Sequence, residues 1–273
     1  MVVFLNVSPE AVSKLTKIGF KKEPIKTIYE QTRLKHGGVT AILYTSGKLL
    51  LQGNTAEINA LAPKINKLKL GKEIKTEKLK KETGWIIGSD ESLKGDTFGG
   101  VVVGAVKADL KGRQELAKIG VTDSKLLSDK EILPMADKIR QVVSCEVRSI
   151  LPEEYNVSGG ITGILNHLHS ECARYLAPGK HIVDKYPGCT IGDIREEKAE
   201  SKYLEVAAAS ILARAAALKQ LDYLSTQAGF ALPKGSTHVA HALHELKERG
   251  LPFHKFVKMD FRNVSEFLKQ GKE

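Results

Sequence analysis

The chain has 273 residues, of which 42% are apolar and 27% charged, a composition that is ordinary for a folded globular protein and sufficient for two domains. No apolar run approaches the roughly 20 residues of a membrane-spanning helix, and Met1 to Asn6 has neither the basic flank nor the length of a signal peptide. We therefore expect a cytoplasmic protein without membrane contact. The three widely spaced cysteines agree with reduced thiols and argue against a zinc site.

The net charge of +10 is concentrated at one end of the chain. Residues 1–80 contain 15 lysines and arginines but only six acids, so they carry +9, whereas the rest of the chain is almost neutral. This asymmetry favours an N-terminal module that is attracted to a polyanion such as nucleic acid. A lysine-rich solubilising surface is the alternative interpretation.

The first 70 residues predict a small α+β unit. The expected order is strand, helix, three antiparallel strands and helix, over residues 2–6, 8–18, 27–34, 39–44, 48–52 and 56–68. A sheet face that mixes cations with aromatic rings suits nucleic-acid binding. The candidates for this face are Arg33, Lys35, Tyr44 and Lys48. The polar, lysine-rich residues 71–84 predict a linker.

From Trp85 onward the pattern changes. Strands are predicted over residues 85–89, 100–108, 145–151 and 181–184, and helices over residues 160–175, 201–228 and 236–249. Strands that come first and are followed by strand–helix alternation predict an α/β domain over residues 85–273, with a mixed sheet and helices on its faces.

Carboxylates follow two of the apolar strands. Asp90 and Glu91 come directly after Ile86 to Ser89, and Asp184 closes a second apolar strand. Glu200 precedes a helix so rich in alanine that it can lie close to a sheet. Because strand ends and a helix start can converge at one edge of an open sheet, we expect a single site with clustered carboxylates. Such a site suits magnesium-dependent phosphoryl transfer.

Two alternatives qualify this expectation. Consecutive strand residues point to opposite faces, so Asp90 and Glu91 can share a site only if the strand ends or twists there. Each acid taken alone could be a surface charge or a helix cap. Asp193 and Glu197 lie close enough in sequence to compete with Glu200.

The run Asp90-Glu91-Ser92-Leu93-Lys94-Gly95-Asp96 resembles the Asp-Glu-x-Gly-Lys-Gly-Asp signature of type 3 ribonuclease H, the ribonuclease HIII family. Further matches are Thr122-Asp123-Ser124-Lys125, Tyr155-Asn156, Lys198-Ala199-Glu200-Ser201 and Leu232-Pro233-Lys234-Gly235. This resemblance covers the chain from about residue 85 to its end. The N-terminal unit resembles the TATA-box-binding-protein-like module of the same family.

The resemblance implies an RNase H-like fold, preceded by a TATA-box-binding-protein-like domain that binds substrate. It also implies an endoribonuclease that cleaves the RNA strand of RNA/DNA hybrids with two Mg²⁺ or Mn²⁺ ions and leaves 5′-phosphate and 3′-hydroxyl ends. The metal-binding and catalytic acids would be Asp90, Glu91, Asp184 and Glu200. Substrate contacts would come from Leu93, Lys94, Gly95, Ser124 and Lys125, with Arg33, Lys35, Tyr44 and Lys48 from the N-terminal domain. No obligate protein partner is evident.

Leu93 departs from the signature, which has glycine at this position. In the related enzymes the glycine-rich turn brings backbone amides to the substrate phosphate and the ribose 2′-hydroxyl. Leucine should close off positive φ and narrow this approach. Two other functions therefore stay open: incision at single ribonucleotides in duplex DNA by a type 2-like enzyme, and hybrid binding with weak catalysis. Lys94 and the additional domain argue against the first, and the retained acids argue against the second.

Overall fold

The computed structural model describes residues 2–27, 30–45, 47–73, 82–121 and 124–270. The chain divides into two compact units, Met1–Thr76 and Glu77–Glu273. Three sequence predictions lie partly outside the described residues: the linker at 74–81, the strand at 28–29, and the motif residues Thr122 and Asp123. Among the described residues, no helix has both the length and the apolarity that crossing a membrane requires.

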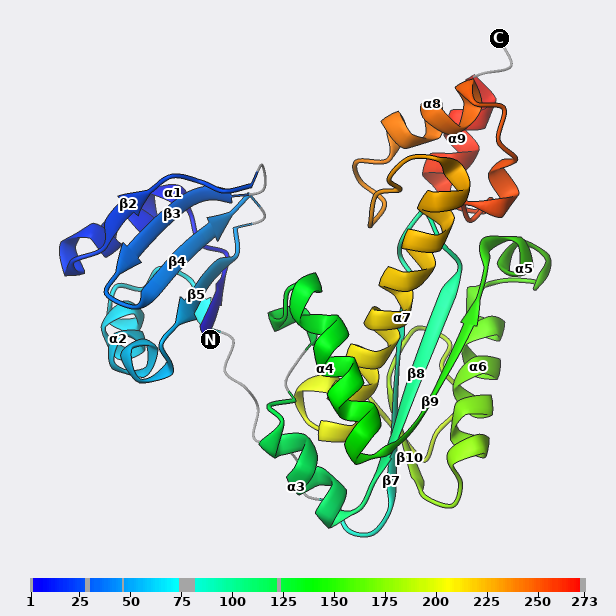
Figure 1. Ribbon diagram of the computed structural model, residues 1–273, viewed down its shortest axis with the longest axis horizontal. Helices are drawn as coiled ribbons and strands as arrows, with labels where there is room; N and C mark the ends of the chain where they lie inside the picture. The colour runs from blue at the N-terminus through cyan, green and yellow to red at the C-terminus, as the bar shows by residue number, and fades with distance from the viewer. Residues whose placement is uncertain (1, 28–29, 46, 74–81, 122–123, 271–273) are drawn as a thin grey trace. The chain divides into compact units, whose positions relative to one another are not determined.

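The first unit is a six-stranded antiparallel sheet with helices on one face (Figure 1). The strand order is β2-β3-β4-β5-β1-β6. The strands are β1 (Val2–Leu5), β2 (Lys21–Glu23), β3 (Glu30–His36), β4 (Val39–Tyr44), β5 (Leu49–Gly53) and β6 (Lys72–Glu73). The helices are α1 (Pro9–Ser13), which continues as the 3₁₀ helix η1 (Lys14–Ile18), and α2 (Thr55–Lys67). Leu34, Leu43 and Leu51 face the helices and form the core with them.

The two strands that the sequence did not predict here are both short and polar. β2 pairs with β3, and Lys72 and Glu73 of β6 pair with Leu5 and Phe4 of β1. The residues predicted to begin the linker therefore belong partly to this sheet. Neither strand has an apolar alternation that sequence could reveal, because pairing with a neighbour defines a polar edge strand.

The second unit contains a five-stranded mixed sheet between helices, in the order β11-β10-β7-β8-β9. The strands are β7 (Ile86–Ser92), β8 (Val101–Ala108), β9 (Ser144–Ile150), β10 (Lys180–Asp184) and β11 (Ile194–Glu196). β10 runs parallel to β7, while β8 runs antiparallel to it. The long helix α7 (Leu204–Ala228) crosses one face of the sheet, and α6 (Ile161–Leu176) covers the other (Figure 1). This arrangement confirms the predicted mixed sheet flanked by helices.

Two glycines allow α7 to lie in backbone contact with the sheet. A Cβ atom on Gly88 of β7 would lie 2.4 Å from the Val206 amide nitrogen, and one on Gly104 of β8 would lie 2.6 Å from the Ala209 carbonyl oxygen. Such separations are too short for any side chain, so only glycine fits. The start of α7 is thereby held against the centre of the sheet.

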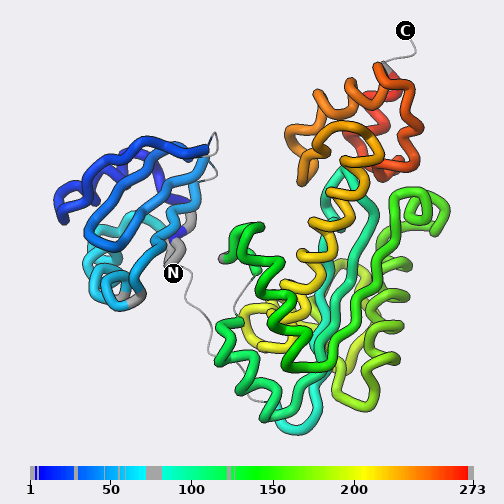
Figure 2. The backbone as a smooth tube through the Cα atoms, viewed as in Figure 1, coloured from blue at the N-terminus to red at the C-terminus, as the bar shows by residue number. Residues whose placement is uncertain are grey.

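Several helices were missing from the sequence prediction. They are α3 (Leu110–Lys118), α4 (Asp129–Val142), α5 (Pro152–Val157) and α9 (Arg262–Gln270). The last predicted helix is shorter than expected, as α8 (Ala240–Glu248). Beyond α8, the chain returns to the turn that joins β7 to β8 (Figure 2), where Phe98 and Val257 form an isolated antiparallel bridge.

Candidate active site

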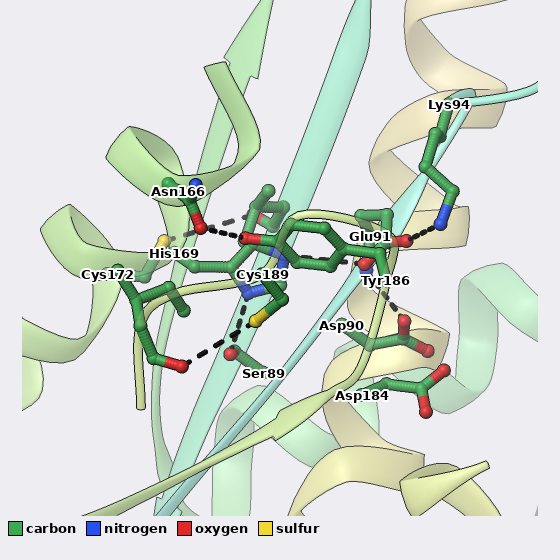
Figure 3. Close-up of polar contacts among 12 residues, drawn as sticks. Ser89, Asp90, Glu91, Lys94, Asn166, His169, Cys172, Asp184, Tyr186 and Cys189 are labelled. Carbon is green, nitrogen blue, oxygen red and sulfur yellow. Dashed lines mark hydrogen bonds and ion pairs between the residues drawn. The ribbon is translucent and has the colours of Figure 1, made fainter. Parts of the chain in front are cut away.

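Two parallel strands place Asp90 and Asp184 side by side. Val183 of β10 is in register with Ser89 of β7, so the next residue of each strand is an aspartate. Both lie toward the carboxyl ends of their strands, on the face that α7 covers. Asp90 is 7% exposed. Their carboxylates lie next to each other in Figure 3.

Glu91 lies on the other face of the sheet. β7 continues through both acids to Ser92, whereas the sequence analysis required it to end or twist there. Asp90 therefore faces α7, where Ser210 hydrogen-bonds to it, and Glu91 faces His169 of α6. The Glu91 carboxylate still raises the pKa of Asp90, because the two residues are joined by one peptide bond. The N–H of this peptide, from Glu91, donates to Asp90 Oδ1 at 2.8 Å. The site thus wraps around the end of the sheet.

Glu200 joins this group through a short 3₁₀ turn before α7, η3 (Ala199–Ser201). The Ala199 N–H donates to Asp184 Oδ1 at 2.9 Å, and the following Glu200 is only 4% exposed. By contrast, the Glu197 side chain is 78% exposed, and Asp193 accepts a hydrogen bond from the His181 N–H at 2.7 Å. These positions favour Glu200 over both competing acids.

Burial and mutual repulsion make two of the acids reluctant to ionise. Burial raises the pKa of Asp90 well above its ordinary value, and the Glu91 and Asp184 carboxylates raise it further. Burial and the Glu200 carboxylate raise the pKa of Asp184 to about 6. Crowded carboxylates whose charges oppose one another in this way call for a cation between them.

Glu91 stays ionised because cationic and polar groups surround it. Burial raises the pKa of Glu91, but a hydrogen bond from His169 and the charges of His169 and Lys94 outweigh burial, so the net pKa is lowered. Lys94 Nζ is hydrogen-bonded to Glu91 Oε1, and His169 Nε2 lies 3.4 Å from Oε2 (Figure 3). The apolar helical pattern around His169 indicates a packed or hydrogen-bonded histidine, but no sequence pattern placed it beside Glu91, because it lies on α6, far from Glu91 along the chain.

His169 is itself held by a buried polar network. Its Nδ1 lies 2.7 Å from the Ser89 hydroxyl, which also lies 2.8 Å from His181 Nε2. A hydroxyl can donate to one imidazole while it accepts from the other, so both bonds can form at once. Burial and the neighbouring His169 lower the pKa of His181 to about 4, which keeps this ring neutral. Tyr186 packs against His169 with ring centroids 5.3 Å apart.

The chemistry of these acids suits a divalent cation. Among the described residues, however, no three His, Cys, Asp or Glu side chains are already arranged so that they could hold a metal ion. One oxygen of each of two carboxylates accepts a hydrogen bond from a lysine. Lys94 Nζ donates to Glu91 Oε1, and Lys125 Nζ donates to Glu200 Oε1 at 2.6 Å. The second oxygen of Glu200, Oε2, is buried without a hydrogen-bond partner in the described part of the chain, and that of Glu91 has only His169 Nε2 nearby, at 3.4 Å. Unsatisfied carboxylate oxygens are the hard ligands that Mg²⁺ and Mn²⁺ take.

The turn after the acids keeps a left-handed residue despite the leucine. Leu93 has φ +66°, so the expectation that leucine would close off positive φ is wrong. Its side chain is 5% exposed and packs in a core cluster with Phe98, Ala217 and Leu221. Burying a leucine contributes about 1.5–3 kcal/mol, which is enough to offset the ~1–2 kcal/mol cost of a left-handed residue. Beside it, a Cβ on Gly95 would meet nothing within 4 Å, so the backbone of the turn stays open to close approach.

This balance predicts that Leu93→Gly destabilises the second unit although it restores the signature. Relief of the strained φ returns ~1 kcal/mol, while loss of the buried side chain costs about 2–5 kcal/mol, so the variant should lose ~1–4 kcal/mol. Leu93→Ala keeps the strain and should lose more. The single tryptophan, Trp85, lies in this unit and allows urea unfolding to be followed by fluorescence. A Leu93→Gly variant as stable as the unmodified protein would contradict this explanation.

The predicted phosphate-binding pair faces two directions. Ser124 is 4% exposed and its hydroxyl lies 2.7 Å from the Ser210 hydroxyl, so it points inward, toward the residue that hydrogen-bonds to Asp90. The Lys125 side chain is 69% exposed beside Glu200. Of this pair, Lys125 is therefore the side chain whose position suits a phosphate contact.

In the first unit, the four predicted substrate residues share the sheet face opposite the helices. Leu34, Leu43 and Leu49 face the core, so the alternating neighbours Arg33, Lys35, Tyr44 and Lys48 face away from it. The charge of Arg33 is engaged, however, with Glu30 at 3.2 Å and Glu23 at 3.4 Å, and its side chain is 9% exposed. Lys35 Nζ lies farther from Glu23, at 3.8 Å, and the Lys35 side chain is 54% exposed. This face offers Lys35 more readily than Arg33 to an anionic partner.

Comparisons with known proteins agree with this geometry. The sequence profile of the family described as ribonuclease HII matches residues 87–185 and 180–264. Ribonuclease HIII of Streptococcus pyogenes is 34% identical over 77% of this chain and 78% of its own length. The crystal structure of Bst-RNase HIII in complex with Mn²⁺ aligns with a TM-score of 0.62 at 26% identity, over 100% of this chain and 99% of that chain.

Two more solved structures are similar to this chain, one over almost its whole length and one over about two thirds of it. Aquifex aeolicus RNase H3 aligns with a TM-score of 0.56 at 28% identity, over 95% of this chain and 100% of that one. RNase HII of Archaeoglobus fulgidus, solved in a complex with PCNA, aligns with a TM-score of 0.57 at 28% identity over 67% of this chain and 96% of its own. The full-length matches include the N-terminal unit, whereas this last one leaves a third of the chain uncovered. The chain therefore belongs to the ribonuclease HIII family, and the protein is a ribonuclease H.

Proposed function

We propose that this ribonuclease H cleaves the RNA strand of RNA/DNA hybrids with Asp90, Glu91, Asp184 and Glu200 as ligands of two Mg²⁺ or Mn²⁺ ions. The observation that carries this proposal is the convergence of four carboxylates at one sheet edge, where burial and repulsion raise the pKa of Asp90 and Asp184. When bound, such ions supply an activated water and stabilise the leaving oxygen of a phosphodiester. The products would carry 5′-phosphate and 3′-hydroxyl ends.

The carboxylates have distinct supports in this mechanism. The Ala199 N–H and the Ser210 hydroxyl orient Asp184 and Asp90, respectively, so the carboxylates need little rearrangement to bind cations. His169 holds Glu91 from the opposite face. Lys94 and Lys125, now bound to Glu91 and Glu200, can turn to substrate phosphates once cations neutralise the acids.

Substrate recognition would follow from the open turn and the basic first unit. The backbone of Leu93-Lys94-Gly95 would contact the RNA strand, where a 2′-hydroxyl distinguishes RNA from DNA. The exposed lysine face of the first unit would hold the duplex through phosphates, so sequence selectivity should be low. Both contacts are those that the resemblance to ribonuclease HIII implies for this chain.

A cleavage assay with three substrates tests the proposal. The purified protein is incubated with a uniform RNA/DNA hybrid, a DNA duplex that carries one ribonucleotide, and an all-DNA duplex, each with Mg²⁺, Mn²⁺ or a chelator. We expect metal-dependent cleavage of the hybrid alone. Preferred incision at the single ribonucleotide would support the type 2-like alternative instead, and tight hybrid binding without cleavage under any metal would contradict both enzymatic interpretations.

A further inference from the structure

Lys258, near the C-terminal end of the chain, is a fully buried lysine. Its exposed fraction is 0%, although it follows the exposed Lys255 by three residues and belongs to a segment whose basic and aromatic pattern suggests a surface contact. A lysine is almost never completely buried unless its charge is matched by partners. Its position therefore excludes direct contact with a nucleic acid and requires another explanation.

All three ammonium hydrogens of Lys258 have backbone acceptors in one loop. Nζ lies 2.8 Å from the Leu93 carbonyl oxygen, 2.6 Å from that of Asp96 and 2.9 Å from that of Gly99. The Leu93 carbonyl oxygen also accepts the Asp96 N–H of the same turn, at 3.2 Å. An ammonium has three donors, so this set uses its full capacity. The three acceptors lie along the connection from β7 to β8. This connection begins at Leu93, directly after β7 ends at Ser92.

The surroundings of Lys258 make its charge costly. Its ammonium lies 5.5 Å from the centre of the Tyr155 ring and 5.2 Å from that of Phe261. Burial lowers the pKa of Lys258 to about 8, and Asp96 and Asp260 offset only part of this effect. A methionine of similar length would fill such a site without a desolvation penalty. Stability alone is therefore a weak reason for a lysine here.

These three hydrogen bonds from Lys258, here called the clamp, set the direction of the Lys94 amide in the turn proposed to face the substrate. In a trans peptide the C=O and the following N–H point in opposite directions, so an inward Leu93 carbonyl turns the Lys94 N–H outward. The peptides that follow Asp96 and Gly99 already have acceptors for their N–H groups. The Thr97 N–H donates to the Gly235 carbonyl at 3.0 Å, and the Gly100 N–H donates to Gln220 Oε1 at 2.7 Å. Among the described residues, only the Lys94 N–H of these three has no acceptor.

We propose that Lys258 is a positioning residue for substrate discrimination: its ammonium fixes the Leu93–Lys94 peptide so that the Lys94 N–H faces the RNA strand. Lys258 does not touch the substrate and acts through the turn. This inference rests on the proposed function, in which that turn distinguishes RNA from DNA. An N–H in this position can donate to a ribose 2′-hydroxyl, which the corresponding position of a DNA strand lacks.

The test compares binding of an RNA/DNA hybrid and of a DNA duplex of the same sequence, both measured with chelator by fluorescence anisotropy. For Lys258→Met we expect the hybrid-over-DNA preference to fall about tenfold, the value of one hydrogen bond to substrate. Lys255→Met, the exposed lysine of the same segment, should retain the full preference. Under turnover conditions, Lys258→Met should raise KM for the hybrid more than it lowers kcat, and affinity for Mn²⁺ should stay within about twofold of the unmodified protein.

A second variant keeps the test decisive if Lys258→Met does not fold. Asn156 holds the segment that carries Lys258, since its Nδ2 donates to the His254 and Val257 carbonyls at 2.9 Å and its Oδ1 accepts from the Met259 N–H at 2.9 Å. Asn156→Ala should loosen the clamp and lower the hybrid preference about threefold. An unchanged preference in every folded variant, or equal weakening toward both duplexes, overturns the role of Lys258. Lack of any hybrid preference in the unmodified protein would instead overturn the proposed function.

Discussion

Asp90→Asn and Asp184→Asn variants should lose cleavage of RNA/DNA hybrids and yet melt at a higher temperature than the unmodified protein when no metal is present. Each variant removes a metal ligand, and the loss of several kcal/mol of transition-state stabilisation corresponds to a rate reduction of about a thousandfold or more. The gain in stability has a separate origin, because the carboxylates repel each other in the metal-free site.

The sign of the stability change follows from the raised pKa of Asp184. Its value of about 6 in the folded protein exceeds the ordinary 3.8, so the folded state binds this proton more tightly than the unfolded chain. The corresponding stability is fully present below about pH 4 and is lost as pH rises through about 6. Two pKa units would represent ~3 kcal/mol at full burial, and partial exposure reduces the expected gain to ~1 kcal/mol, or about 2–4 °C for a chain of this size.

Calorimetric melting with chelator at pH 4 and pH 7.5 checks this prediction. The asparagine variants should gain stability at pH 7.5 and gain much less at pH 4, where the unmodified Asp184 is already protonated. Glu197→Gln is the matched control, since Glu197 lies in the same connection as Glu200 but its side chain is 78% exposed. This control should retain both activity and melting temperature. Lower melting temperatures for both asparagine variants at pH 7.5 would show that the acids stabilise the fold and do not repel each other.

Removal of residues 1–76 should weaken hybrid binding about ten- to a hundredfold at physiological salt and reduce the salt dependence of binding. This unit holds 13 of the chain's 42 lysines and arginines but only five of its 32 acids. Each phosphate contact contributes a slope of about 0.9 in a plot of log affinity against log salt concentration, so loss of two to four contacts should flatten the slope by roughly two to four. The active-site acids all belong to the second unit, so kcat at saturating hybrid should change little.

Point substitutions locate the effect on the sheet face of the first unit. A Lys35→Gln, Lys48→Gln double variant of the full chain should reproduce part of the lost slope. Lys219→Gln, an exposed lysine on α7 of the second unit, provides a control of equal chemistry. Binding titrations over a range of salt concentrations report both affinity and slope. If the truncated chain binds the hybrid as tightly as the full chain with the same slope, the basic unit does not bind the substrate.

The sequence was most informative where a local pattern meets a fixed geometry. Ile86-Ile87 and Ile182-Val183 mark buried strands, and both end in acids. This pattern led us to expect that their acids share one site, and the parallel pairing of the two strands, which only the structure shows, places Asp90 beside Asp184. The alanine-rich start of α7 likewise indicated the close helix packing that brings Glu200 to the same edge.

The remaining features depend on contacts that sequence does not encode locally. His169 and Lys258 act on Glu91 and Leu93 across large sequence separations, and each looks like an ordinary helical or basic residue in its own segment. The strain at Leu93 is offset by a core cluster that forms only after α7 and the C-terminal segment have packed. Helix α4 carries a capping box at Ser128 and Glu131, a signal that was available but was opposed by Pro134 within the helix.

The most direct test of the central claim is a Mn²⁺ binding measurement on the unmodified protein and the Asp184→Asn and Glu197→Gln variants, by isothermal titration calorimetry. If the four carboxylates hold the catalytic ions, the unmodified protein and Glu197→Gln should bind Mn²⁺ with the same affinity, and Asp184→Asn should bind at least about tenfold more weakly. Equal affinity in Asp184→Asn and the unmodified protein would contradict the account, because the cation site would then lie away from the convergent acids.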